Sequence, residues 1–174
     1  TDYYKLCEQT PLWFEQYFVR SFSVLASHLS HDSSIHVFNI ATPGQKLLPE
    51  QCRELPITVK QVVSVFLGSL HFSVAVLNVK ERIVLVYDGL KYPMHTWKVH
   101  TLDLLKRCKL IATDYEEHFG WVKGNKVMTL PHPEGAWFLK QGLALVKQTN
   151  HYDCGPLACL KIMEIFERLP RNLK

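Results

Sequence analysis

The sequence predicts an α+β fold in one domain that spans residues 1–174. A helical apolar pattern comes first, β-branched strands occupy the middle of the chain, and an apolar helix closes it. With 47% apolar residues and no repeat or linker, the 174-residue chain has the material for one hydrophobic core. Because it begins at Thr1 and ends at Lys174, we expect it to be a segment of a longer protein.

The N-terminal part predicts a helix over residues 12–29, because apolar residues recur there at three- and four-residue steps. The residues of this stripe are Phe14, Phe18, Phe22 and Leu25. A turn is predicted at residues 30–34, a short strand at 35–40 and a loop at 41–56.

β-Branched and aromatic runs predict three strands in the middle of the chain. The strands are residues 61–67, 71–77 and 82–87. Beyond them the sequence predicts helices at residues 101–108 and 110–118 and a turn at 123–126. The apolar run at 137–146 fits more than one type of element.

The last two strands flank a polar stretch and predict an antiparallel hairpin. A turn centred between Val79 and Lys80 places His71 directly opposite Asp88, with Cβ atoms about 4.5–5.5 Å apart on one face. A slip of one residue would put the two side chains on opposite faces. The hairpin therefore predicts an imidazole–carboxylate pair that depends on the turn.

The most informative motif is Gln-Thr-Asn-His-Tyr-Asp-Cys-Gly-Pro at residues 148–156. An apolar pattern follows it and predicts a helix packed on the core. Pro156 suits a first helical turn, because the N–H that proline lacks would be unpaired there. Cys154 thus lies at the positive end of a helix dipole, which favours the nucleophilic thiolate.

A thiolate nucleophile needs a base, a group that orients the base and a donor for the oxyanion. His71 can serve as base and Asp88 as its orienting carboxylate. The Gln148 side-chain amide and the Cys154 backbone N–H can stabilise the oxyanion. The alternatives are structural: a strand-end histidine, an Asp-Gly turn and a solvated loop glutamine.

Composition and charge argue against several other classes of protein. The net charge of +4 is spread along the chain, so we expect no nucleic-acid partner. No apolar run approaches the roughly 20 residues of a membrane span. Five cysteines, an odd number without a CxxC pair, favour a reducing compartment, so we expect an intracellular protein of the nucleus or cytoplasm without a metal site.

The order His71, Asp88, Gln148, Cys154, with steps of 17 and 6 at its two ends, resembles the ubiquitin-like-protein-specific protease family. These are the SUMO and NEDD8 (sentrin-specific) cysteine proteases of the adenain-like clan. The resemblance covers about residues 12–169. It implies a papain-like or adenain-like α+β fold, with a central mixed sheet and a buried helix that carries the nucleophile, and the four catalytic roles given above. It implies no cofactor, and we expect a monomer.

The resemblance also implies a substrate. The expected reaction is cleavage after the C-terminal Gly-Gly of a ubiquitin-like modifier, with SUMO ahead of NEDD8 and ubiquitin. A tunnel closed by aromatic side chains admits only residues without a Cβ, and Trp13 and Phe72 are the candidate lids, with core packing as their alternative. Asp153 and Gly155 complete the expected substrate-binding set, although Asp153 can instead cap the helix.

Some positions depart from the family pattern. Phe72 stands where the family usually has tryptophan, Pro156 is unusual after the Cys-Gly pair, and the stretch before Trp13 is short. These departures leave the choice of modifier open. The alternatives are a viral-type or mobile-element-type processing protease, an acyltransferase with the same thiol, and a catalytically idle modifier-binding module.

Overall fold

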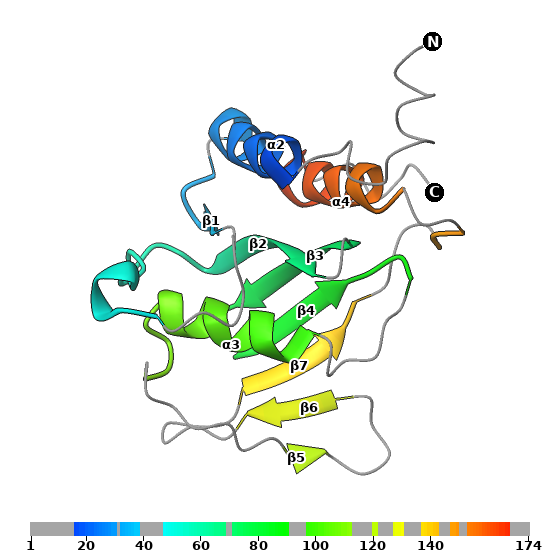
Figure 1. Cartoon of the computed structure of the whole chain (residues 1–174). Coiled ribbons are helices and arrows are strands. Elements are labelled where there is room, and N and C mark those ends of the chain that lie inside the picture. The colour runs from blue at the N-terminus through cyan, green and yellow to red at the C-terminus, as the bar shows by residue number, and fades with distance from the viewer. Residues whose placement is uncertain are drawn as a thin grey trace.

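A mixed β-sheet organises the chain, with helices on both of its faces (Figure 1). The computed structural model describes residues 16–30, 32–38, 47–68, 71–90, 97–112, 120–121, 127–130, 137–142, 147–149 and 153–167. In this part of the chain seven strands pair in the order β1-β2-β3-β4-β7-β6-β5. Neighbours β1–β2 and β4–β7 are parallel and the other neighbours are antiparallel, which confirms the predicted α+β class with a mixed sheet.

The element bounds follow the chain order. The strands are β1 (Ile35–Val37), β2 (Gln61–Gly68), β3 (His71–Asn78), β4 (Ile83–Tyr87), β5 (Gly120–Trp121), β6 (Val127–Leu130) and β7 (Trp137–Gln141). The helices of the described residues are α2 (Gln16–Ser30), α3 (Lys98–Arg107) and α4 (Cys154–Glu167), with a short 3₁₀ helix η1 (Pro49–Gln51).

The sheet lies between two hydrophobic cores, with α3 on one face and α2 and α4 together on the other (Figure 1). The core under α3 includes Phe66, Leu77, Leu104, Leu105 and Leu139. The core under α2 and α4 includes Val19, Val65, Val74, Ile162 and Phe166. Because both faces of β3 are covered, this strand is buried without alternation from its first residue to Leu77, which explains its continuous apolar sequence.

Helix α2 buries only part of the apolar pattern that predicts it. Phe18 and Leu25 of the predicted stripe are 50% and 56% exposed, and Phe14 lies outside the described residues. Phe22 of the stripe packs against the core under α2 and α4, together with Ala26 and the fully buried Val19. These three side chains lie on the side of α2 that packs against α4. The position of the neighbouring helix, and not apolar spacing alone, therefore determines which side chains of α2 are buried.

The predicted helix at residues 110–118 is wrong in its described part. Lys109 adopts a left-handed backbone conformation (φ 53°) and ends α3, as is common one residue after a helix cap. Residues 110–112 then form a bend, and residues 113–118 lie outside the described part of the chain. Strands β5 and β6 were not predicted, β7 occupies the start of the apolar run at 137–146, and the turn predicted at 123–126 lies outside the described residues.

Candidate active site

The four predicted catalytic residues lie at one end of the sheet. His71 is the first residue of β3, Asp88 follows the last residue of β4, and Cys154 is the first residue of α4. Since β3 and β4 are antiparallel, the start of one and the end of the other lie together, beside the first turn of α4 (Figure 1). The Gln148 backbone N–H donates to the Gly89 carbonyl at 3.0 Å, which ties the loop before α4 to this end.

His71 and Asp88 pair as predicted, but by a different register. Val74 lies opposite Tyr87, so His71 and Asp88 are diagonal neighbours and not directly opposite partners. The predicted turn was misplaced because Asn78 belongs to β3 and Arg82, with a left-handed φ of 55°, belongs to the turn. The resulting shift is an even number of residues, which keeps both side chains on the same face.

The imidazole is anchored directly to the carboxylate. His71 Nε2 lies 2.5 Å from Asp88 Oδ1, and the same oxygen accepts the Leu90 backbone N–H at 2.9 Å. The second bond holds the carboxylate in an Asx-type turn, which aims it at the ring. With Nε2 engaged by Asp88, Nδ1 is the nitrogen left for Cys154, to which His71 is also hydrogen bonded.

The charge of His71 follows from these contacts. Burial alone would lower the pKa of His71, but the hydrogen bonds and charges of Asp88 and Cys154 outweigh burial and raise that pKa to about 9. The ring is therefore held as an imidazolium at neutral pH. An imidazolium next to a cysteine sulfur is the environment that favours a thiolate.

Gln148 packs closely against the turn that follows Asp88. A Cβ added to Gly89 would lie 2.9 Å from Gln148 Cβ, 3.3 Å from its Oε1 and 3.2 Å from Leu157 Cδ1. Only glycine fits between the loop and the first turn of α4. The Asp-Gly pair, which the sequence marks only as a turn signal, is thus also a packing requirement of the site.

All four side chains are withdrawn from water. Cys154 and Asp88 are 2% exposed, and His71 and Gln148 are 3% exposed. Electrostatic interactions are stronger in such surroundings than in water. Because Cys154 as a residue is almost fully buried, a substrate can reach it only if neighbouring groups move aside.

Solved structures match the architecture that holds these residues, whereas no protein-family model and no curated protein matches the chain. A crystal structure described as a de-sumoylating protease matches 94% of this chain and 65% of its own, with a TM-score of 0.55 and 14% identity. The SUMO protease Ulp1, with its catalytic cysteine oxidised to a sulfonic acid, matches 90% of this chain and 68% of its own, with a TM-score of 0.50 and 11% identity. The chain has the fold of the SUMO proteases.

This likeness concerns the fold, because the sequence identity is low. The chain spans about 65% of the length of the first of the two structures. The fold expected from the motif resemblance is confirmed, including the helix that begins at the candidate nucleophile and packs on the sheet. Within the SUMO-protease fold of this chain, the catalytic roles remain predictions for the residues named above.

The structure describes three of the four predicted substrate-binding residues. Phe72 is 2% exposed and points into the core under α4, on the face opposite His71, a placement that fits the core-packing alternative. Asp153 precedes α4, and its carbonyl accepts the Leu157 N–H at 2.9 Å, which is the N-cap position. Gly155 is buried, and Trp13 lies outside the described residues.

One neighbour of His71 was not predicted. The Trp97 ring lies 6.1 Å from the His71 ring between centroids, at an angle of 36°. Trp97 immediately precedes α3, which begins at Lys98, before the predicted start at residue 101. No periodicity or motif links the two residues, so the sequence contained no signal for this contact.

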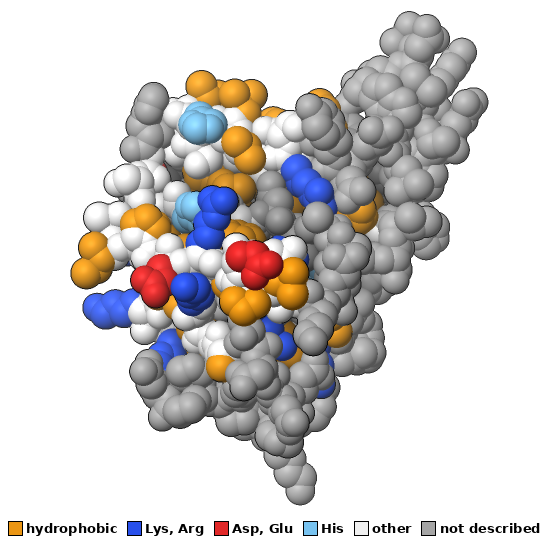
Figure 2. Space-filling model, turned by 60° about the vertical axis from the view of Figure 1, so that its left-hand side comes forward, with side chains coloured by type: hydrophobic (Ala, Val, Ile, Leu, Met, Phe, Trp, Pro, Cys, Tyr) orange, Lys and Arg blue, Asp and Glu red, His pale blue; other side chains and the backbone are white. Residues whose placement is uncertain are grey.

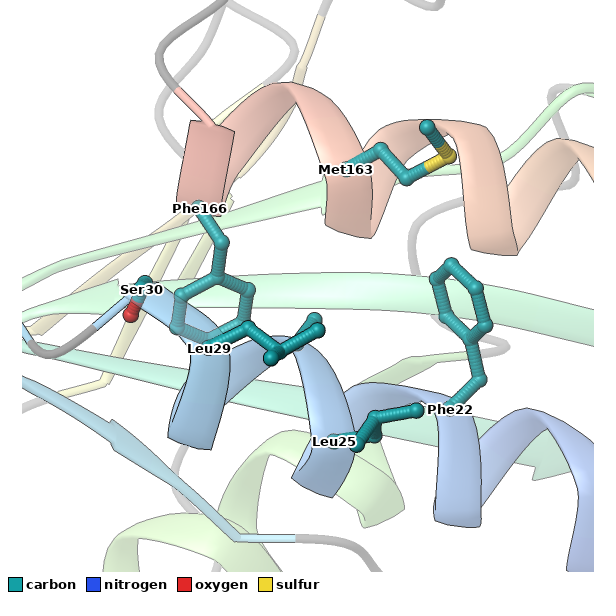
Figure 3. A pocket seen from close by; sticks show the side chains of 7 residues that line it. Phe22, Leu25, Leu29, Ser30, Met163 and Phe166 are labelled. Atoms are coloured by element: carbon teal, nitrogen blue, oxygen red, sulfur yellow. The ribbon is translucent and has the colours of Figure 1, made fainter.

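A groove of about 410 Å³ lies between α2 and α4, away from the catalytic residues (Figure 3). Its lining includes Phe22, Leu25, Leu29, Met163 and Phe166. None of the lining side chains is ionisable, so the groove is an apolar surface and not a reaction centre. Met163 is about 13 Å along the helix from Cys154 at 1.5 Å per residue.

One face of the molecule carries described side chains of mixed type. On the face in Figure 2, acidic and basic side chains lie interspersed among apolar ones. The described residues contain no cluster of three or more side chains suited to a metal ion. None of the helices in the described ranges combines the length and apolar character that a bilayer crossing requires.

Proposed function

We propose that residues 1–174 form a thiol protease domain that cleaves after the C-terminal Gly-Gly of a ubiquitin-like modifier. It would release the modifier from lysine or mature its precursor, with SUMO as the first candidate and NEDD8 and ubiquitin as the others. The observation that carries the proposal is the His71–Asp88 contact of 2.5 Å, made by an imidazole that is also hydrogen bonded to Cys154. The SUMO-protease fold supports it at the level of architecture.

The first half of the reaction forms a thioester. Cys154 Sγ, as a thiolate, attacks the carbonyl carbon of the terminal glycine, and the carbonyl electrons move to oxygen. The Gln148 amide and the Cys154 backbone N–H donate to this oxyanion. When the intermediate collapses, the C–N bond breaks and His71 gives its proton to the leaving amine.

The second half returns the enzyme to its starting state. Neutral His71 removes a proton from water, the resulting hydroxide adds to the thioester carbonyl, and the C–S bond breaks. The modifier leaves as a carboxylic acid that releases its proton to solvent, and Cys154 recovers the thiolate form beside a protonated His71. Asp88 stabilises the imidazolium at both stages, and no cofactor takes part in the proposed cycle.

The coverage of Cys154 favours a second candidate, a module that binds a modifier without cleaving it. Cys154 is 2% exposed as a residue, which suits a binding module better than an open active site. A processing protease or acyltransferase with another substrate also fits the same catalytic residues. In each case we expect the protein to work in a reducing compartment, in the nucleus or cytoplasm, because the four cysteines of the described residues are free.

Modifier vinyl sulfones test the proposal. SUMO, NEDD8 and ubiquitin probes would be incubated with the full chain, and adducts would be mapped by peptide mass spectrometry. We expect a thioether at Cys154 with at least one probe, and with SUMO first. Fluorogenic modifier amides would then compare kcat/KM for the modifiers that react.

Two variants from the same helix control the experiment. Cys154→Ala should lose the adduct and keep measurable modifier binding, whereas Cys159→Ala, five positions along α4, should keep the adduct. Binding without any adduct would overturn the protease and favour the idle module. No binding and no adduct would overturn the modifier as ligand, and cleavage of Gly-containing peptides would then identify a processing protease.

A further inference from the structure

We propose that Trp97 is a positioning residue that holds the His71 imidazole in the orientation needed to bridge Asp88 and Cys154. The inference deepens the proposed function, on which it rests, because it names a further residue of the same site. The proposed role of Trp97 is indirect. It acts through the His71 ring, whose centroid is 6.1 Å from the centroid of the indole. This separation is within the range over which aromatic rings pack.

The histidine needs such a support because of its place on the sheet. His71 points toward the face covered by α3, whereas Cys154 belongs to the core on the other face, under α2 and α4. The imidazole must therefore reach past the end of the sheet to meet the thiol. The χ2 torsion of histidine has a broad energy profile, so packing and not intrinsic preference must select the ring orientation.

Burial, ring packing and a hydrogen bond to its carbonyl fix the position of Trp97. It is 1% exposed. The centroid of its ring lies 6.4 Å from that of Phe66 in the sheet and 5.7 Å from that of His100 in α3. His100 also stacks on Phe66 at 4.8 Å. The Thr101 hydroxyl donates to the Trp97 carbonyl at 2.8 Å, which fixes the backbone at the start of α3. The docking of α3 on the sheet thus sets the position of the indole.

The electrostatic setting also suits an imidazolium. Aromatic rings exclude water from one side of the His71 ring and add no positive charge there. His100, the ionisable neighbour in this stack, remains neutral at physiological pH because burial lowers its pKa to about 4. The groups that stabilise the positive charge on His71 are therefore Asp88 and Cys154, the two partners that the proposed reaction uses.

The test compares three variants of the full chain. Trp97→Leu removes the aromatic wall, Trp97→Phe keeps a smaller one, and Leu105→Ala removes a fully buried side chain of the same helix and core that belongs to no aromatic contact with His71. NMR of ¹⁵N-labelled histidine, assigned with His71→Gln, would report the tautomer of His71 and the midpoint of its titration. Modifier amides that react with the wild type would give kcat and KM.

We expect Trp97→Leu to lower the titration midpoint of His71 from near 9 toward 6.5, to lose the single tautomer that the neutral ring shows at pH values above its midpoint, and to reduce kcat by about 10- to 100-fold at unchanged KM. Trp97→Phe should show a smaller shift in the same direction. Leu105→Ala should unfold at a lower temperature and keep the wild-type titration of His71.

A wild-type titration of His71 in Trp97→Leu would overturn the inference. If that variant does not fold, a wild-type titration in Trp97→Phe would overturn it instead. An equal shift in Leu105→Ala would overturn it too, because the effect would then report only lost stability. If every modifier substrate is silent while the NMR shifts occur as expected, the positioning role stands and the proposed substrate falls.

Discussion

His71 connects the chemistry of the site with the stability of the fold. Its pKa is raised to about 9 in the folded protein, above the usual value of 6.5, because Asp88 and Cys154 more than offset the effect of burial. A group with a raised folded pKa stabilises the folded state at pH values below its unfolded pKa. That contribution is lost as the pH rises through the folded pKa. Between about pH 6.5 and 9, the protein should therefore lose the stability that the imidazolium supplies.

Replacing Asp88 by Asn tests this linkage and the orienting role together. The variant keeps the shape of the side chain and removes its charge, so activity should fall by up to about 10⁴-fold, the loss that the same change causes in a serine triad. The decrease in unfolding free energy from pH 6.5 to 9, expected to be on the order of 1–3 kcal/mol in the wild type, should shrink. Urea denaturation at several pH values measures it. Near-normal activity would mean that another carboxylate orients His71.

The cysteines of the chain should differ in reactivity for electrostatic reasons. Burial raises the pKa values of Cys159 and Cys108 to about 12, so both remain thiols at neutral pH. Cys154 faces the His71 imidazolium instead. At pH 7.5, iodoacetamide should modify Cys154 at least about tenfold faster than Cys159, as followed by peptide mass spectrometry.

Exposure alone predicts the opposite order, because Cys159 is 8% exposed and Cys154 is 2% exposed. His71→Gln is the control: it should remove the advantage of Cys154 and leave Cys159 unchanged. Faster modification of Cys159 in the wild type would show that access, and not the ion pair, controls reactivity.

At the scale of the element, α4 must be held so that its first residue meets His71. Lys161 provides one such link to the sheet, because its Nζ lies 3.7 Å from the centroid of the Tyr87 ring. The same nitrogen lies 2.8 Å from Glu164 Oε2, and the Lys161 side chain is only 12% exposed. Tyr87 is the last residue of β4 and directly precedes Asp88, so this contact joins α4, which begins at the candidate nucleophile, to the strand next to the candidate orienting carboxylate.

Lys161→Ala should therefore destabilise the protein by about 1–2 kcal/mol, from a partly buried cation–π contact and a partly buried ion pair. Leu160→Ala on the same helix is the matched control, since Leu160 is 49% exposed and its loss should change stability by less than about 0.5 kcal/mol. Chemical denaturation of both variants measures the difference. Equal stability of the two would show that Lys161 does not clamp α4.

On the scale of the whole molecule, one sheet separates two cores, and the candidate catalytic residues come from both sides of it. His71 contacts the aromatic residues under α3, and Cys154 belongs to the core under α2 and α4. The site exists only where the end of the sheet lets the two sides meet. Loss of packing on either face should consequently disturb the catalytic geometry together with the fold.

Leu77→Ala tests the dependence of the fold on the core under α3. Leu77 is fully buried, and its truncation should cost about 2–5 kcal/mol. Ile57→Ala, at a fully exposed position, should be nearly neutral. Thermal unfolding followed by circular dichroism measures both. A loss of less than about 1 kcal/mol for Leu77→Ala would indicate that this core is loosely packed.

Local sequence patterns were sufficient for several features of this protein. The β-branched runs predicted β2, β3 and β4, and the apolar spacing after Cys154 predicted α4, because strand and helix periodicities are properties of neighbouring residues. The residue types and order of His71, Asp88, Gln148 and Cys154 were also legible in the sequence. An even shift in register left His71 and Asp88 on one face, so that pairing survived an error in the turn.

Only the tertiary structure decided the turn that sets the hairpin register, the buried face of α2, and the contact of Trp97 with His71. Each depends on what packs against the segment from elsewhere in the chain. Arg82 adopts a left-handed backbone conformation and belongs to the turn and not to the strand. The packing of α4 on α2 determines which side chains of α2 are buried. Residue types thus determined which chemistry is available to this chain, and long-range packing determined where those groups meet, because local periodicity carries no information about distant neighbours.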